Sequence, residues 1–422
     1  MTWLAACVPV VAQKAATTTE TNPPAVSWRL GAQWLSTGRW LDPAESRLNP
    51  GNRILRLPQF WAQTEVRPDV RVTGGSRFVL VARPRLLAST RSAWSADTPR
   101  LDTRDTSANW TELYAHWRMT DSVQVTYGLQ NFQWGPAELL SPSNRLFHEV
   151  GVFRDPAYYV RGRHLARLNV SAGKEWSIVT LAELGHNGED AFNSGEPFKR
   201  QGQTKVEYAS PDGRGYVGAT VGVRDGSRAW FGEYGSWAVT QGLSIYVDAS
   251  HSRGSRAWYP EAHADGVFFS RRLSDASRWQ LLGLMGMRYV FVNGIDWRGE
   301  YVHQQAGYSQ NDTRLAVQAA TASPGPFVFE RLTAPGLEVL GRRLVLASLR
   351  VPDLPPRDRV SIQGRYLHSL TDHSGVAFAT ATLETSDALV LFGSALVSRG
   401  PVTGEFARLA RASAIAGALW TW

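Results

Sequence analysis

Arginine residues recur at intervals of two and four positions along much of this chain. Arg83 is followed by Arg85, and Arg163 by Arg167. Even spacing places guanidinium groups on one face of an extended strand, because successive strand side chains point to opposite faces. A row of permanently charged, planar N–H donors suits carboxylate, phosphate or sulfate groups. The arginines assigned to this face are Arg67, Arg71, Arg83, Arg85, Arg118, Arg161, Arg163, Arg167, Arg298 and Arg365.

Carboxylates occupy the same face, so two interpretations of these arginines stay open. In one, the arginines line a lumen and form a track for anionic or dipolar solutes. In the other, they form a ladder of cross-strand salt bridges, each contributing about 1 kcal/mol or less when solvated. The two can coexist. The acidic residues concerned are Glu65, Asp69, Glu112, Glu207, Asp248, Asp296 and Glu300.

The most distinctive segment outside the strands is 130–144, which reads QNFQWGPAELLSPSN. Gly135 and Pro136 predict a turn directly after Trp134, and a second turn follows at 141–144. The apolar pair between the turns must pack against something, and we expect a constriction loop folded into a barrel. An outer lid or a protein–protein contact is the alternative. The candidate loop residues are Trp134, Gly135, Pro136, Glu138 and Asn144.

The elements that must position these residues are strands. From Val26 onward, segments alternate apolar and polar residues, as in VQVTYGLQ at 123–130. The connections separate a membrane barrel from a soluble sheet, since outer-membrane barrels alternate short turns with long loops. Short links fall at 73–77, 120–122, 172–174, 210–214, 240–242, 293–294 and 385–387. Longer ones fall at 90–108, 134–157, 185–202, 254–277 and 307–341. No amphipathic helix stands out.

The chain ends on ASAIAGALWTW, residues 412–422. Trp420 and Trp422 fall on the same side of an extended strand, and no charged tail follows them. The segment resembles the C-terminal signature strand of bacterial outer-membrane β-barrels. That resemblance implies that Trp420 and Trp422 form a signal read by the barrel-assembly machinery. A terminal strand of a soluble sandwich is the alternative. Counting back predicts an all-β antiparallel transmembrane barrel of about 18 strands, closed by pairing 412–422 with 26–35, with both termini periplasmic.

The composition agrees with this class. The chain has 422 residues, with 17 Trp, 13 Tyr and 16 Phe, and lacks the roughly 18-residue apolar run of a membrane helix. A formal charge of +8 favours anionic partners such as lipopolysaccharide or acidic polysaccharide. Nucleic acid is not expected, because the arginines are spread along strands rather than clustered.

The N-terminus reads MTWLAACVPVVA over residues 1–12. It is typical of a truncated secretory signal with a small-residue cleavage site. Residues 4–7 also match a lipobox, which would make Cys7 a lipidated N-terminus. We therefore predict a signal-like segment at 1–12, a flexible lead-in at 13–25 and a single barrel domain at 26–422.

No catalytic or metal-binding motif stands out. G-x-S-x-G and H-E-x-x-H are absent, and Cys7 is the only cysteine. His251, His263 and Asp265 lie in expected outer loops, but most chains of this length contain such a set. The sequence therefore predicts no enzyme, no cofactor and no metal, with an outer-membrane hydrolase as a minor alternative.

The WGP segment at 134–136 resembles the W-G-P…L…S…N stretch of the Wzi-type capsule-assembly barrels, which are 18-stranded outer-membrane proteins. The chain departs from that family in lacking an N-terminal helical plug. We expect a porin-like channel in a Gram-negative outer membrane, in contact with its lipid and lipopolysaccharide, with an arginine-rich lumen for anionic or saccharide solutes. A barrel that assembles or attaches capsule polysaccharide without conducting solute is the alternative.

Overall fold

The computed structural model describes residues 26–46, 48–95, 97–147, 154–160, 162–185, 189–190, 193–272, 277–322, 326–333, 335–355 and 358–422. The predicted signal segment 1–12 and lead-in 13–25 lie outside the described residues, as does Arg161.

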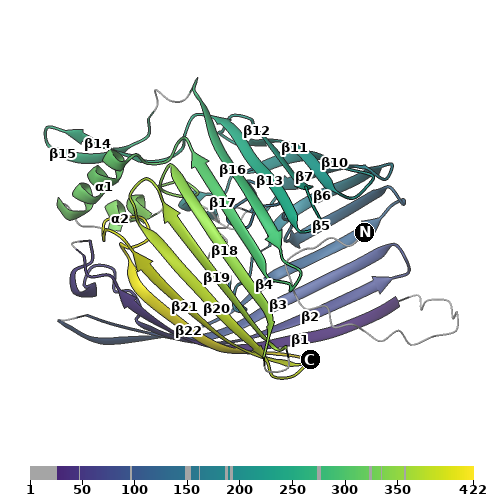
Figure 1. Cartoon of the computed structure of the whole chain (residues 1–422), viewed down its shortest axis with the longest axis horizontal. Coiled ribbons are helices and arrows are strands. Elements are labelled where there is room, and N and C mark those ends of the chain that lie inside the picture. The colour runs from purple at the N-terminus through teal and green to yellow at the C-terminus, as the bar shows by residue number, and fades with distance from the viewer. Residues whose placement is uncertain are drawn as a thin grey trace.

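Eighteen strands pair in one closed antiparallel barrel, which confirms the predicted fold class (Figure 1). Each barrel strand pairs with the next along the chain, and β22 closes the ring on β1. The first barrel strands are β1 (Val26–Pro43), β2 (Phe60–Gly74), β3 (Phe78–Ser95), β4 (Thr98–Arg118), β5 (Val123–Gln130), β6 (Arg163–Ala172), β7 (Trp176–Glu183), β10 (Gln201–Ala209) and β11 (Gly215–Arg224). The others are β12 (Trp230–Ala238), β13 (Leu243–Arg253), β16 (Trp279–Val290), β17 (Asp296–Gln304), β18 (Arg343–Leu354), β19 (Val360–Ser369), β20 (Gly375–Glu384), β21 (Leu389–Arg399) and β22 (Ala410–Thr421).

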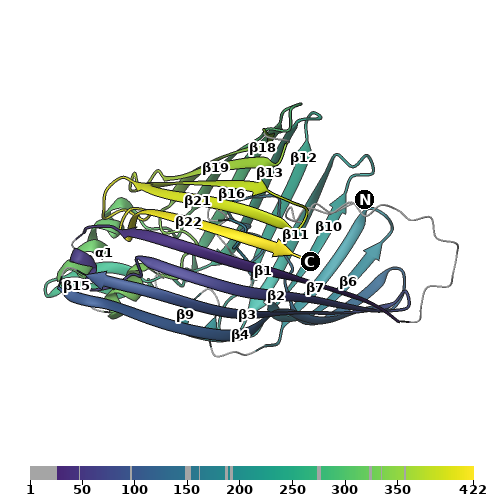
Figure 2. The ribbon, with the colours of Figure 1, turned by 90° about the horizontal axis from the view of Figure 1, so that it is seen from below.

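The last strand lies beside the first, as Figure 2 shows with β22 in yellow and β1 in purple. The Trp422 N–H donates to the Ala32 carbonyl at 3.0 Å, and the Ala32 N–H donates back at 3.0 Å. The last strand closes the barrel on the first, as expected. The paired part of β1 is Gln33–Pro43, however, and not residues 26–35. Residues 26–31 of β1 extend beyond Trp422, the last residue of the neighbouring strand, and pair only with β2.

The wall follows the predicted alternation. Apolar side chains face outward, and aromatic residues mark both ends of the outward band. On β4, Trp110 is 44% exposed and Trp117 is 50% exposed. Aromatic rows at two levels, with apolar residues between, are typical of a strand that crosses a bilayer. Inward-facing side chains are largely polar, so polar groups line a lumen.

Short turns gather at the end of the barrel that holds the C-terminus, and most long connections lie at the opposite end (Figure 1). One predicted loop was wrong. Residues 90–108 continue β3 and β4 as a paired hairpin, in which Ser95 pairs with Thr98. Its alternating Ser, Thr, Leu and Trp residues suit a strand. β5 pairs with β4 only from Leu113 to Arg118, so the outer part of β4 has no partner on that side.

The other small elements lie in the connections. They are η1 (Pro50–Asn52), the hairpins β8 (Glu189–Asp190) with β9 (Asn193–Pro197) and β14 (Tyr259–His263) with β15 (Gly266–Ser270), and the helices α1 (Gln310–Ala322) and α2 (Pro326–Thr333). The sequence analysis missed α1, although Ser309 and Asp312 form a capping box at its start. Among the described residues, no helix has the length and apolar character to cross a membrane.

Inward-facing aromatic rings lie over glycines of neighbouring strands. Phe392 of β21 covers Gly417 of β22, and a Cβ added at Gly417 would clash with that ring and approach the Ser36 carbonyl oxygen to 2.9 Å. The seam between β21, β22 and β1 therefore depends on glycine at this position.

We predict that Gly417→Val destabilises the barrel by about 1–3 kcal/mol, because overpacking forces the ring and both strands to shift. The measurement is the midpoint of urea unfolding in detergent, followed by heat-modifiable gel mobility. Ala416→Val places the same valine side chain on the outward face and should leave the midpoint near that of the wild type. Equal midpoints for the two variants would contradict the assignment.

Candidate functional site: the lumen and its inward-folded loop

The described residues of the connection between β5 and β6, 131–147 and 154–160, pack against the inside of the barrel wall. Leu139 is fully buried and Leu140 is 3% exposed, and both pack among wall residues that include Tyr246 and Leu282. Trp134 packs in a second cluster with wall residues such as Tyr234. The loop therefore contacts two separate parts of the wall.

Two wall carboxylates hold the loop by its backbone. Glu300 of β17 accepts the N–H groups of Glu138 at 2.6 Å and of Leu139 at 2.8 Å. Asp248 of β13 accepts the Ser143 N–H at 2.7 Å. A carboxyl oxygen accepts hydrogen bonds whether or not the group carries a proton. These bonds satisfy donors that would otherwise be buried without a partner.

The side chains of the loop complete the anchoring. The Glu138 carboxylate accepts from Arg365 Nε at 2.6 Å and lies 3.6 Å from Arg298 Nε. Gly135 has a φ of 103°, and a Cβ there would lie 2.5 Å from Asp248 Oδ2 and 2.5 Å from Ser141 Oγ. The site thus requires glycine both for its backbone conformation and for space.

Two remaining candidates play local roles. Asn144 is fully buried, and its side-chain oxygen accepts the N–H groups of Leu146 and Phe147 at 3.3 Å each. Pro136 is partly buried at the turn that follows Trp134. Both residues shape the loop and neither carries charge.

The second described part of the loop, residues 154–160, is called the returning arm and contacts the wall at β2 and β3. Arg67 of β2 donates to the Ala157 carbonyl at 3.1 Å, and Arg85 of β3 stacks over Tyr159, with its guanidinium carbon 3.8 Å from the ring centroid. Arg365 donates to the Arg154 carbonyl at 3.2 Å. Burial raises the pKa of Asp155 above its ordinary value, although nearby Arg39, Arg67 and Arg365 act in the other direction.

Six of the ten predicted arginines are paired with carboxylates. Glu65 is 1% exposed and lies between Arg67 and Arg85, and Arg83 pairs with Asp69 and Glu112. The other paired members are Arg163 with Glu183, and Arg298 and Arg365 with Glu138. Glu65 and Glu138 each serve two arginines, and Arg298 also lies 3.7 Å from Asp296, so carboxylates offset much of the positive charge at these six positions.

Three arginines form a group of a different kind. Within the described part of the chain, Arg71, Arg118 and Arg167 have no carboxylate within ion-pair distance, and all three lie close enough to His116 for their charges to act on it. Arg167 donates to Thr126 Oγ1 at 3.1 Å and lies 4.3 Å from the centroid of the Phe132 ring. Figure 1 shows that their strands β2, β4 and β6 belong to one side of the barrel.

Sequence reasoning missed several residues of the site. Arg39 lies near Asp155, and Tyr159 lies under the Arg85 guanidinium. His116 lies near Arg71, Arg118 and Arg167, with its Nδ1 3.0 Å from Thr126 Oγ1. The alternation of β1 and β4 could have placed Arg39 and His116 on the inward face. Nothing in the sequence indicated which wall residues the loop would contact.

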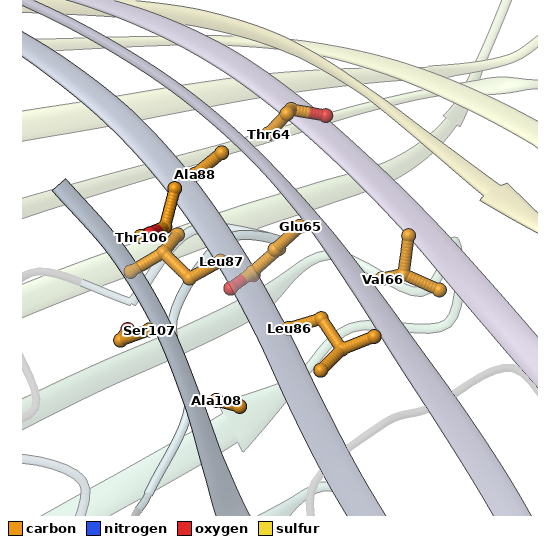
Figure 3. Close-up of a pocket in the computed structure, with 9 residues that line it drawn as sticks. All are labelled: Thr64, Glu65, Val66, Leu86, Leu87, Ala88, Thr106, Ser107 and Ala108. Carbon is orange, nitrogen blue, oxygen red and sulfur yellow. The ribbon is translucent and has the colours of Figure 1, made fainter. Parts of the chain in front are cut away.

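A shallow depression of about 540 Å³ lies over β2, β3 and β4 (Figure 3). Most of its lining residues, including Val66, Leu86 and Ala108, alternate in the outward direction. It is therefore a feature of the outer wall, separate from the lumen.

Comparisons with known proteins place the fold. No protein-family model matches the sequence, and no curated protein sequence is significantly similar. The chain is similar in structure to the outer-membrane porins OccAB1 of Acinetobacter baumannii (TM-score 0.54, 9% identity, 93% of this chain and 96% of that chain) and OccK5 of Pseudomonas aeruginosa (TM-score 0.52, 9% identity, 93% and 97%). Wzi of Escherichia coli, described as a carbohydrate-binding β-barrel involved in group 1 capsule assembly, aligns with a TM-score of 0.49, 11% identity, and 92% and 83% coverage. The predicted porin-like barrel fold is confirmed.

Replacing the anchor should release the loop. We predict that Glu300→Gln speeds amide hydrogen exchange at Glu138 and Leu139 by roughly 10–100-fold, because one buried N–H loses its acceptor at a cost of about 1–3 kcal/mol. Exchange followed by mass spectrometry measures this. Glu183→Gln, which alters a different lumen ion pair, should leave exchange at these positions unchanged, and equal effects of both variants would argue against a specific anchor.

Proposed function

We propose that the protein is a channel of the bacterial outer membrane that passes anionic or anionic-saccharide solutes through a cationic lumen. The observation that carries this proposal is the group formed by Arg71, Arg118 and Arg167, which lack carboxylate partners in the described part of the chain. Permanent positive charges on the wall of a water-filled lumen attract anions and repel cations. The fold shared with outer-membrane porins supports the membrane setting.

The loop gives the lumen two unlike sides. On the side of β13, β17 and β19, loop and wall pack together through Glu300, Asp248 and Glu138. On the side of β2 and β3, Arg67 and Arg85 contact the returning arm of the loop. We infer that a solute passes along the arginine side, first by Arg67 and Arg85 and then by the unpaired group.

The orientation follows from the same proposal. Short turns are typical of the periplasmic end of such barrels and long loops of the outer end. Since β1 starts and β22 ends at the short-turn end, both termini would be periplasmic. Contacts with lipopolysaccharide, and recognition of Trp420 and Trp422 by the assembly machinery, remain predictions.

The charge of the lumen can be tested directly. We predict that the triple variant Arg71→Gln, Arg118→Gln, Arg167→Gln shifts the reversal potential in a salt gradient from anion-selective toward cation-selective, because three uncompensated charges leave the wall. The measurement is conductance in planar bilayers. Arg104→Gln, an exposed arginine on the outward face of β4, is the matched control and should keep the wild-type reversal potential.

The same conductance measurement distinguishes a channel from the alternative, a barrel that binds polysaccharide without conducting solute. The loop contacts several sides of the wall, and a barrel closed by it could hold a polysaccharide without conducting. A wild-type protein that folds but gives no conductance, and gives none after removal of residues 134–144, would contradict the channel proposal. Release of surface polysaccharide on loss of the protein would then favour attachment.

The anion selectivity of the lumen should depend on pH. The raised pKa of Asp155 means that this carboxyl binds a proton at higher pH than an ordinary aspartate does. As pH falls through that value, one negative charge beside Arg39 and Arg67 is lost, and anion selectivity should rise. Reversal potentials measured across the acidic range check this. Asp155→Asn should show the higher anion selectivity already at neutral pH and should lose the increase on acidification. If the variant keeps the pH dependence of the wild type, this role of Asp155 is excluded.

A further inference from the structure

A titratable pair lies on the outer wall, where apolar residues are expected. Glu233 of β12 shares its face with Phe231 and Trp237, each 44% exposed, and its cross-strand neighbours are Ala219 of β11 and Ala249 of β13. His251 of β13 points the same way. The Glu233 side chain is 49% exposed and that of His251 is 27% exposed.

Lipid alone would satisfy this pair poorly. Glu233 lies two residues below Phe231, which at a rise of about 3.3 Å per residue places it inside the aromatic level of the outward band. His251 Nε2 lies 2.8 Å from Glu233 Oε1. No described residue is a hydrogen-bond partner of the second oxygen, Oε2. Ionisable groups facing hydrocarbon are costly and rare, so this one indicates a function.

The surroundings favour close approach by another surface. Ala219, Glu233, Ala249 and Gly283 form a continuous cross-strand row over β11, β12, β13 and β16. Small side chains in such a row let a second wall come near. The Phe231 ring stacks on the His251 imidazole, with centroids 4.5 Å apart and an interplanar angle of 14°. The imidazole is therefore held in place beside the carboxylate.

We propose that this face, centred on Glu233 and His251, is a lateral contact with a second copy of the chain. Copies in one membrane are related by an axis along the membrane normal, so groups at the same depth meet. Glu233 and His251 are hydrogen-bonded neighbours on adjacent strands, so the pair of one copy meets the same pair of the next. Each copy then brings both an acid and an imidazole to the contact, which makes the surface self-complementary. An anionic lipid headgroup fits less well, because Glu233 repels it.

Cross-linking tests the contact in place. In a Cys7→Ser background, Ala249→Cys should form disulfide-linked dimers when isolated outer membranes are treated with a mild oxidant. Ala379→Cys is the matched control, because Ala379 is an outward-facing alanine on β20 with small neighbours, Gly364 and Ala395, and no charged pair beside it. Equal yields from the two single-cysteine variants would overturn the proposal.

The double variant Glu233→Leu, His251→Leu tests the pair itself. It should lower the Ala249→Cys cross-linking yield at least about tenfold, which corresponds to about 1.4 kcal/mol of association free energy. Light scattering after size exclusion should show a smaller assembly than the wild type. A wild-type protein with the mass of one chain, or a double variant that loses bound lipopolysaccharide at unchanged mass, would overturn the proposal. Bilayer conductance of the same variants is independent of these readouts and tests the channel function separately.

Discussion

The burial of Glu300 in the wall of the barrel constrains the rest of the lumen. A carboxylate at 4% exposure needs donors, and two consecutive loop N–H groups together with the Tyr246 hydroxyl provide them. A buried loop has the complementary need, because its backbone groups lose water on entering the barrel. The wall and the loop therefore stabilise each other, and neither arrangement is favourable alone.

That mutual requirement determines where charge is neutralised. Once the Glu138 backbone is fixed by Glu300, its side chain reaches Arg365 and Arg298 and removes part of their charge from the lumen. The returning arm brings Tyr159 and the Ala157 carbonyl to Arg85 and Arg67, but its described residues bring no carboxylate within ion-pair distance of Arg71, Arg118 or Arg167. The cationic surface that remains is thus set by the path of the loop as much as by the number of arginines.

The sequence was a good guide to features that depend on local pattern. Period-two alternation predicted the strands and the face on which the described arginines lie, and the Gly135-Pro136 turn predicted a distinct loop. It failed where the outcome depends on contacts distant in the chain. Arg85 and Glu65 meet only because β2 and β3 pair in one register, and the hairpin at 90–108 extends beyond the point where the neighbouring connection turns inward. The capping box at Ser309 was a local signal for α1 that the strand pattern obscured.

The inner face of the wall is mostly polar and the outer face mostly apolar. On each face, the residues that depart from this pattern are the most informative. Inside, polar residues are ordinary, so buried apolar residues such as Leu139 reveal the packed loop, and arginines without nearby acids motivate the proposed solute path. Outside, apolar residues are ordinary, so the hydrogen-bonded pair of Glu233 and His251 among alanines and glycines stands out. A polar group facing lipid must recover its lost hydration from another partner. Within a membrane, a neighbouring protein surface can provide that partner at the depth of Glu233.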